Sequence, residues 1–345
     1  MIIAPDPSSS RSALADWIEI TAFLRGRAAG AGDLDSLLRL NSDNDRERPL
    51  AGSQVVEEEI AETPREDLAL RVADEIGFRL SALGDDYPFE VLSNPLRVKL
   101  KQVRNDSSHD AYLFMLLMTA CRDHRFKSDD AVGSTVAAGR TLFHICASLG
   151  VAGMIKGGNT FWFGWPRPDK SNFAAALNQL SGKLGFSSAK DPPPPGLPTA
   201  AKDDQIDVVG WRSYGDRRTG TLVVICQAAT GNDWDGKSVT PHLLAFTDWF
   251  DRAPYRLATP CLAVPFPVHH EVDDRDDEDY EEAVFNALQR LNGRHGVMLD
   301  RLRITESVVP VINRPTVNET VGGFAGVAVF NDWIERLLPQ IAAAA

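Results

Sequence analysis

Residues 206–237 read IDVVGWRSYGDRRTGTLVVICQAATGNDWDGK. Two runs rich in β-branched and aromatic residues, IDVVGW and TLVVICQ, flank the polar turn RSYGDRRTG, and this arrangement predicts a β-hairpin. Three polar side chains interrupt or follow the apolar runs. Asp207 stands inside the first run, Gln227 ends the second, and Lys237 follows ten residues later. Their presence raises the question of whether the hairpin carries a functional site.

The segments on either side of the hairpin predict an α/β fold. Residues 11–165 show mainly helical periodicity, with apolar residues at helical spacing from Arg65 to Leu83. Beyond the hairpin, strands and helices alternate, which is typical of an α/β sheet. Strands are expected at 206–211, 220–227, 258–265 and 297–304, and helices at 111–121, 133–150, 171–185, 241–251 and 281–291.

We therefore expect a helical N-terminal domain at residues 1–158, followed by a mixed-sheet α/β domain at residues 159–345. A short aromatic strand and a double-proline turn in NTFWFGWPRPD, residues 159–169, mark the change of pattern. Residues 27–60 are polar and rich in Gly, Asp and Glu. That composition predicts a loop or a partly disordered arm within the first domain.

The net charge of −12 over 345 residues argues against a protein attracted uniformly to polyanions. Contact with a nucleic acid would need a local basic patch. Two are present, equally compatible with an ordinary solubilising surface: Arg97, Lys99, Lys101 and Arg104, and the hairpin-turn residues Arg212, Arg217 and Arg218.

Cellular location is indicated by the cysteines and by the apolar segments. The four cysteines are far apart and form no CxxC pair. Free thiols in apolar surroundings fit a reducing cytoplasm. The N-terminus lacks the charged start and long apolar core of a signal peptide. The apolar run at 111–121 is about half the ~20 residues that span a bilayer. We expect a cytoplasmic protein without a membrane segment.

The polar residues of the hairpin have the chemistry of a divalent-metal phosphodiesterase. Such a site needs a carboxylate and a second oxygen ligand for a hard cation, and a lysine near the attacking water. Asp207 and Gln227 would offer the two oxygens from adjacent strands. Lys237, just before the helix expected from Pro241, could reach back and stabilise the charge that develops on the phosphate.

This arrangement resembles the PD-(D/E)XK superfamily of restriction-endonuclease-like nucleases. Its signature is an Asp on one strand and a Glu-X-Lys on the next, and here IDVVGW supplies Asp207. Gln227 stands where the Glu would be, and Ala229 where the lysine would be. In a subset of the superfamily a Gln replaces the Glu and the lysine migrates to the following helix, which would be Lys237.

The resemblance implies a restriction-endonuclease-like α/β domain that hydrolyses DNA with Mg²⁺ or Mn²⁺. Asp207, Gln227 and Lys237 would be catalytic, with Asp207 and Gln227 binding the metal. The run QAATGNDW also looks like modules of prokaryotic defence loci, which implies an anti-phage effector, with a protein partner in a defence complex as a further possibility. The alternative is a nuclease-like subunit that has lost activity and serves in binding or scaffolding.

One departure from the superfamily pattern favours that alternative. The superfamily places a Glu on the helix before the hairpin, typically after a Phe. Here Phe143 precedes His144, and Phe173 follows Asn172, so neither helix supplies a carboxylate. Asp169 or Asp233 would have to reach the site from elsewhere.

The hairpin residues also have ordinary structural interpretations, which the sequence leaves open. Asp207 could accept hydrogen bonds from the loop at 201–205, Gln227 could cap free backbone groups, and Lys237 could be a solvated surface charge. The acidic run that follows His269, His270 and Glu271 is expected to be a solvated helix start rather than a metal cluster, facing away from the substrate or toward a basic partner.

Overall fold

The computed structural model describes residues 2–314 and 328–343, with gaps. The gaps are 7, 37–53, 94–95, 103–106, 157, 186, 192–194, 196–201, 215, 217–220, 252–257 and 269–279, and for 54–66 and 280–281 only the backbone is described. The described residues form a mixed helix and sheet structure, so the α/β class is confirmed.

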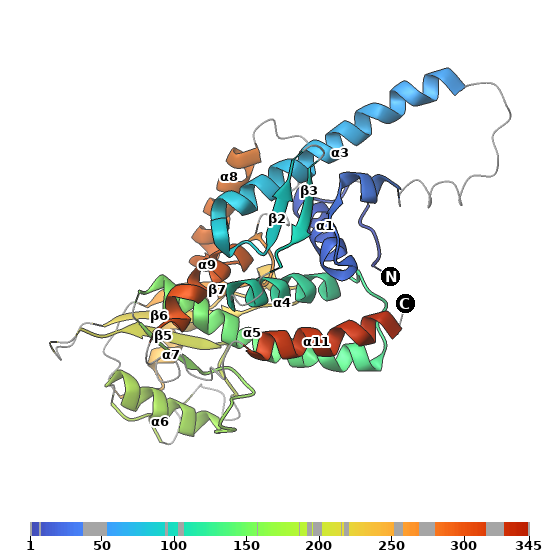
Figure 1. Cartoon of the computed structure of the whole chain (residues 1–345). Coiled ribbons are helices and arrows are strands. Elements are labelled where there is room, and N and C mark those ends of the chain that lie inside the picture. Colours follow the sequence, from blue (N-terminus) through green and yellow to red (C-terminus); the bar gives the residue numbers. More distant parts are fainter. Residues whose placement is uncertain are drawn as a thin grey trace.

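A five-stranded mixed sheet lies at the centre of the C-terminal half (Figure 1). Its strands are in sequence order, β4 to β8. β4, β5 and β6 pair antiparallel, while β6, β7 and β8 pair parallel. The strands are β4 (Asn159–Trp162), β5 (Val208–Arg212), β6 (Leu222–Ala228), β7 (Thr259–Ala263) and β8 (Val297–Leu299).

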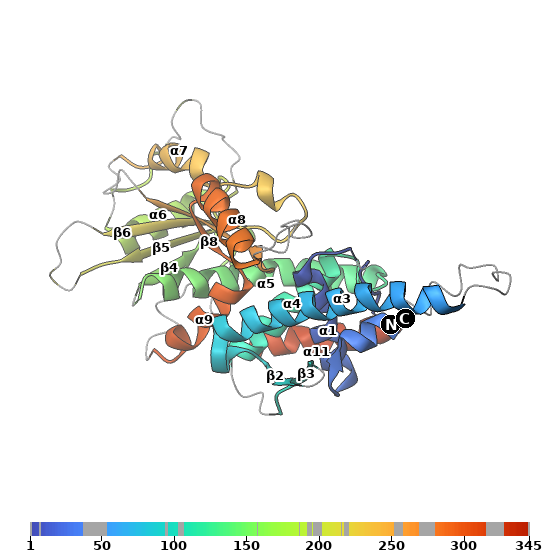
Figure 2. The ribbon, with the colours of Figure 1, turned by 90° about the horizontal axis from the view of Figure 1, so that it is seen from above.

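Helices lie on both faces of this sheet, and a further layer of helices, most of them from the N-terminal half of the chain, lies beyond one face (Figure 2). They are α1 (Arg11–Arg25), α3 (Gln54–Leu83), α4 (Ser107–Arg122), α5 (Asp130–Met154), α6 (Phe173–Leu184), α7 (Leu243–Thr247), α8 (Tyr280–His295), α9 (Arg301–Ile312) and α11 (Ala328–Ala343). A small separate sheet consists of β1 (Ala29–Gly30), β2 (Phe89–Leu92) and β3 (Arg97–Leu100). Single 3-10 turns lie at Gly84–Asp86, Trp234–Gly236 and Thr240–His242.

The alternation of side chains along β5 and β6 gives the large sheet two buried faces. Val208 and Val224 point into the core that contains α5, whereas Val209 and Ile225 point into a second core beneath α6 and α7. The hairpin strands are therefore apolar on both sides. A polar side chain at the end of either strand is therefore an exception among apolar neighbours.

Helix α5 packs on the first face of the sheet and also against α9. It begins at the N-cap Asp129, whose carboxylate accepts from the Val132 N–H at 2.8 Å. Among the described helices, α5 alone is long and apolar enough to cross a membrane by length and composition. Because most of its apolar window is buried inside the protein, this finding is consistent with a soluble protein.

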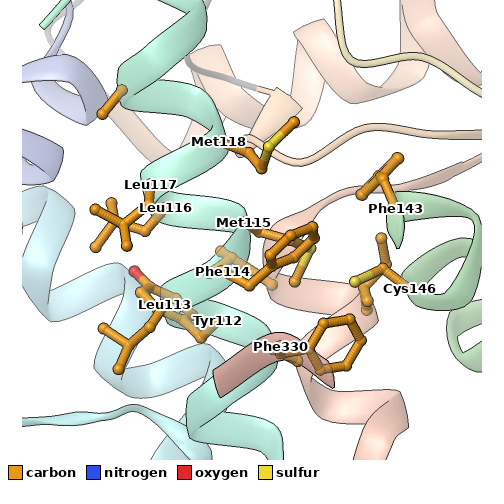
Figure 3. Packing of buried hydrophobic residues seen from close by; sticks show 14 of the residues in the cluster. Tyr112, Leu113, Phe114, Met115, Leu116, Leu117, Met118, Phe143, Cys146 and Phe330 are labelled. Atoms are coloured by element: carbon orange, nitrogen blue, oxygen red, sulfur yellow. The ribbon is translucent and has the colours of Figure 1, made fainter. Parts of the chain in front are cut away.

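One hydrophobic core extends across the domain boundary expected at 158/159 (Figure 3). Phe114 on α4 contacts Phe330 on α11, with ring centroids 5.1 Å apart, and Val208 of β5 belongs to the same cluster. Helices from both ends of the chain thus share one core. The division into two domains at 158/159 stays a prediction.

Two expectations for local structure need correction. α3 begins at Gln54, so residues 54–60 are helical rather than a polar loop, while 37–53 lie outside the described residues. The strand expected at 297–304 ends at Leu299. There the Asp300 carboxylate accepts from the Arg303 N–H at 3.0 Å, and this N-cap starts α9.

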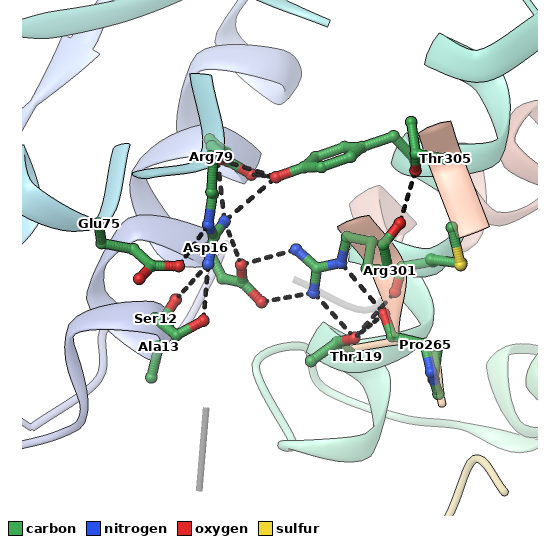
Figure 4. Close-up of polar contacts among 12 residues, drawn as sticks. Ser12, Ala13, Asp16, Glu75, Arg79, Thr119, Pro265, Arg301 and Thr305 are labelled. Carbon is green, nitrogen blue, oxygen red and sulfur yellow. Dashed lines mark hydrogen bonds and ion pairs between the residues drawn. The ribbon is translucent and has the colours of Figure 1, made fainter. Parts of the chain in front are cut away.

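A buried polar network links the helices of the N-terminal layer (Figure 4). Asp16 accepts hydrogen bonds from both Arg79, at 2.7 Å, and Arg301, at 2.8 Å. Other members of the network are Ser12, Glu19, Glu75, Tyr87, Tyr112, Thr119 and Thr305. Because buried charges are costly unless they are paired and hydrogen-bonded, this network constrains how α1, α3, α4 and α9 pack.

Candidate functional site

Asp207 lies at the point where three strands of the large sheet meet. Its N–H donates to the Cys226 carbonyl at 3.0 Å, and its own carbonyl accepts from the N–H groups of Phe163 and Gly164, both at 2.8 Å. At this end of the hairpin the ladder between β5 and β6 stops at the pair Val208↔Cys226. Asp207 forms no ladder pair with Gln227, because its N–H bonds to the carbonyl of Cys226, the residue already paired with Val208.

The Asp207 carboxylate is held on both oxygens by groups from other elements. Oδ2 accepts from the Ala228 N–H at 2.8 Å, and Oδ1 lies 3.1 Å from Nε2 of His144. Its side chain is 14% exposed. The strand-end capping that the sequence left open is therefore present, although its donors come from β6 and α5 rather than from the 201–205 loop.

His144 on α5 is the site residue that sequence reasoning passed over. Its Nδ1 lies 3.0 Å from the Thr141 carbonyl, which can only accept, so Nδ1 carries a proton. The ring stacks on Trp162 with a centroid separation of 5.0 Å and an interplanar angle of 12°. These two contacts fix the ring so that Nε2 faces Asp207. The signal was the Phe143–His144 pair, whose histidine stands in place of the carboxylate in the superfamily pattern.

The charge state of His144 depends on its carboxylate neighbour. Burial of the ring disfavours the charged imidazolium, but the hydrogen bond and the negative charge of Asp207 outweigh it. The pKa of His144 is therefore raised above its ordinary value. Asp203 contributes in the same direction. In its protonated form His144 donates from Nε2 to Oδ1 of Asp207.

Gly164 allows the chain to pass close to this pair. A Cβ at residue 164 would lie 2.4 Å from Oδ1 of Asp207 and 2.9 Å from Nε2 of His144. Real Cβ atoms do not approach heavy atoms so closely, so a larger residue would displace the carboxylate or the ring. Glycine is required here by close approach rather than by an unusual φ angle.

Gln227 is buried at the end of β6 and only half of its amide has a partner. Its Nε2 donates to Oε1 of Gln205 at 3.2 Å. Its own Oε1 has no hydrogen-bond partner among the described residues, although the residue is 5% exposed. A buried carbonyl oxygen without a donor costs free energy, so it is a candidate ligand for a cation or a water.

Lys237 lies apart from the other two predicted residues. It follows the 3-10 turn Trp234–Gly236, is partly exposed, and has its Nζ 3.9 Å from a carboxylate oxygen of Asp233. In the described part of the chain no interaction joins Lys237 to Asp207 or Gln227. The structure thus brings Asp207 and Gln227 to neighbouring strand ends and leaves Lys237 with Asp233.

The carboxylates considered as a replacement for the missing helix Glu are occupied elsewhere. Asp169 accepts from the Ser171 N–H at 2.9 Å and from the Gln179 amide at 2.8 Å. No described interaction brings Asp169 or Asp233 to Asp207. The described residues contain no cluster of three or more His, Cys, Asp or Glu side chains suited to a metal.

In donor chemistry alone, the remaining oxygens suit a hard divalent cation of the Mg²⁺ or Mn²⁺ class. Asp207 supplies a carboxylate with unused lone pairs, and Gln227 supplies an Oε1 without a partner among the described residues. One carboxylate gives the site a single negative charge, which favours weak rather than tight metal binding.

Two members of the predicted basic strip bond to backbone carbonyls of the same chain. Arg97 donates to the Ala28 carbonyl at 2.8 Å, and Lys101 donates to the Asp85 carbonyl at 3.0 Å. Arg104, Arg217 and Arg218 lie outside the described residues, as does the acidic stretch at 269–279. Contact of the basic residues or of the acidic stretch with a partner stays a prediction.

No protein-family model matches this sequence, and no match was found among curated proteins or among solved structures. The function of the site therefore has to be inferred from its own residues and geometry.

Proposed function

We propose that this protein is a metal-dependent nuclease that hydrolyses phosphodiester bonds of DNA. The observation that carries the proposal is the position of Asp207 beside the end of β6, where Gln227 presents a buried oxygen without a partner among the described residues. Buried polar atoms are normally paired, and exceptions concentrate at functional positions. The α/β fold with its mixed sheet accords with the resemblance to restriction-endonuclease-like proteins.

In this proposal Asp207 and Gln227 hold Mg²⁺ or Mn²⁺. A bound divalent cation polarises a phosphoryl oxygen and lowers the pKa of a bound water. The Ala228 N–H and His144 orient the Asp207 carboxylate, and Gly164 keeps the chain close on one side. Lys237 is proposed to orient the attacking water, an assignment that rests on the sequence pattern alone.

A second candidate function is a nuclease-like subunit that binds without cleaving. The specific observation in its favour is the contact of His144 with Asp207 at 3.1 Å, at the helix position where the resemblance requires a carboxylate. An imidazolium there neutralises Asp207 and competes with a cation. A defence setting, a protein partner and a cytoplasmic location are also proposed from the sequence alone.

Cleavage by the purified chain separates the two candidates. Supercoiled plasmid and single-stranded DNA would be incubated with Mg²⁺, Mn²⁺ or EDTA, and the products separated on gels. The nuclease proposal expects nicked or shortened products with a divalent cation and none in EDTA. Intact DNA with both cations, from a protein that still binds DNA, would establish the binding subunit instead.

A further inference from the structure

Trp165 differs from the other six tryptophans of the chain because its side chain is exposed. Its relative exposure is 43%, whereas none of the others exceeds 6%. The buried six are Trp17, Trp162, Trp211, Trp234, Trp249 and Trp333. A single exposed apolar residue needs no explanation in general, so its location decides whether it carries meaning.

Trp165 lies directly beside the candidate site. It follows Gly164, which donates to the Asp207 carbonyl and would collide with Asp207 and His144 if it carried a side chain. Consecutive Cα atoms are about 3.8 Å apart. The Cα that bears the exposed indole is therefore about that distance from the Cα of Gly164, the residue packed against the Asp207 carboxylate.

Other residues hold Trp165 in place. Its backbone N–H donates to Oδ2 of Asp203 at 3.2 Å. The Arg167 guanidinium lies 5.8 Å from the indole centroid, within cation–π range. Arg167 is itself almost fully buried and donates to the carbonyls of Ser171 and Lys202. Trp165 is thus an anchored aromatic surface rather than a side chain on a free loop.

We propose that Trp165 is a stacking platform for a nucleobase next to the phosphodiester bond at the site. The proposal rests on the nuclease function for the phosphate, and it adds the class of substrate. Every base presents a π-face to an aromatic side chain, but in a duplex that face is covered by its neighbours. The preferred substrate would therefore have an unpaired strand at the site.

Binding in EDTA tests the platform without cleavage. Fluorescence anisotropy would measure the affinity of the full chain for a labelled single-stranded 20-mer of mixed sequence and for its duplex. Trp165→Ala is expected to weaken single-strand binding by about 5- to 150-fold, as for loss of one base–aromatic stack. Trp165→Phe should recover most of that loss, because it retains an aromatic face.

Phe285→Ala is the matched control. Phe285 is an aromatic residue of 58% exposure on α8, which packs against β7 and β8 rather than β5. The Phe285→Ala variant should bind the single strand with unchanged affinity. Intrinsic fluorescence adds a second readout, because Trp165 alone among the tryptophans is open to a collisional quencher, and bound single strand should protect it.

The outcomes separate this inference from the proposed function. Single-strand binding that Trp165→Ala leaves unchanged, or that is absent from the wild type, overturns the platform whether or not the protein cleaves. Equal losses in Trp165→Ala and Phe285→Ala also overturn it. Trp165-dependent binding by a protein that cleaves nothing with Mg²⁺ or Mn²⁺ supports the platform and overturns the nuclease function.

Discussion

Arg301 on α9 and Asp16 on α1 form a two-point ion pair, with Nη1–Oδ1 and Nη2–Oδ2 distances of 2.8 Å, although 285 residues separate them in the chain. Both side chains are buried, and Arg79 bonds to the same carboxylate. The first helix of the chain is thus tied to a helix beyond the sheet that carries the candidate site. The pair is strong evidence that α9 belongs structurally with the N-terminal helices.

Breaking this pair should be costly. Arg301→Met leaves Asp16 buried with one cation fewer, so we expect a loss of about 3–5 kcal/mol in the free energy of unfolding. Arg294→Met is the control, because its 2.6 Å pair with Asp235 is about half exposed and should contribute under ~1 kcal/mol. Urea unfolding followed by circular dichroism measures both. Equal losses would mean that the buried pair does not constrain the fold.

The folding of an isolated C-terminal fragment tests whether the two halves of the chain share one core. A fragment starting at residue 159 lacks α5, which packs on β4, β5 and β6. Because that leaves one face of the sheet uncovered, we expect the fragment to be unfolded by circular dichroism and rapidly digested. A stable fragment with intact strand signal would support the boundary at 158/159 as a true domain division.

Gly164→Ala should damage the site more than the fold. The new Cβ forces Asp207 or His144 to move, at a cost of about 1–3 kcal/mol, and should abolish any metal-dependent cleavage. Gly182→Ala is the control, since Gly182 lies within α6 with no described atom within 4 Å of its Cβ, and the change should be neutral or slightly stabilising. Thermal melting and cleavage assays compare them. Full activity in Gly164→Ala would exclude Asp207 as the centre of the site.

The His144–Asp207 contact predicts a pH dependence of stability. The pKa of His144 is raised in the folded state. The stability that its contact with Asp207 contributes is therefore fully present below the unfolded pKa near 6.5 and is lost as pH rises through the folded pKa. In EDTA, the melting temperature of the wild type should exceed that of His144→Gln most in acid, and the difference should shrink as pH rises through the raised pKa of His144. Melting temperatures across that range provide the measurement. A difference that grows with pH would contradict the direction of the shift.

Gln227 offers a test of the metal shell. Gln227→Glu adds a second negative charge at the end of β6 and should tighten Mn²⁺ binding, whereas Gln227→Leu removes the oxygen that has no partner among the described residues and should weaken it. Isothermal titration with Mn²⁺ measures both. Identical affinities in the wild type and the two variants would show that Gln227 is not a ligand.

The hairpin and its polar ends were predictable because strand periodicity is local and the register follows from it. β5 and β6 lie within two residues of the expected ranges, and Asp207 and Gln227 lie at the same end of the hairpin. The contact with His144 was not predictable, because it depends on how α5 packs across a gap of 63 residues. Lys237 was placed by analogy, and no described contact takes it to the site.

The C-terminal helices were missed for a different physical reason. Pro310 lies inside α9 and Pro339 inside α11, and proline inside a helix costs a backbone hydrogen bond. Packing offsets that cost: α9 buries Ile304 and α11 buries Trp333 in the main core. Burial against distant helices is not visible in a local pattern.

The most direct test of the nuclease proposal is the cleavage rate of Asp207→Asn relative to the wild type in Mg²⁺ or Mn²⁺. Asn keeps the shape and can still accept from the Ala228 N–H, but it removes the negative charge that would hold the cation. Asp169→Asn is the control, a carboxylate with its own partners near α6. We predict a loss of at least roughly 10²-fold for Asp207→Asn, with a normal melting temperature, and little change for Asp169→Asn. Equal rates in the wild type and Asp207→Asn would contradict the proposal.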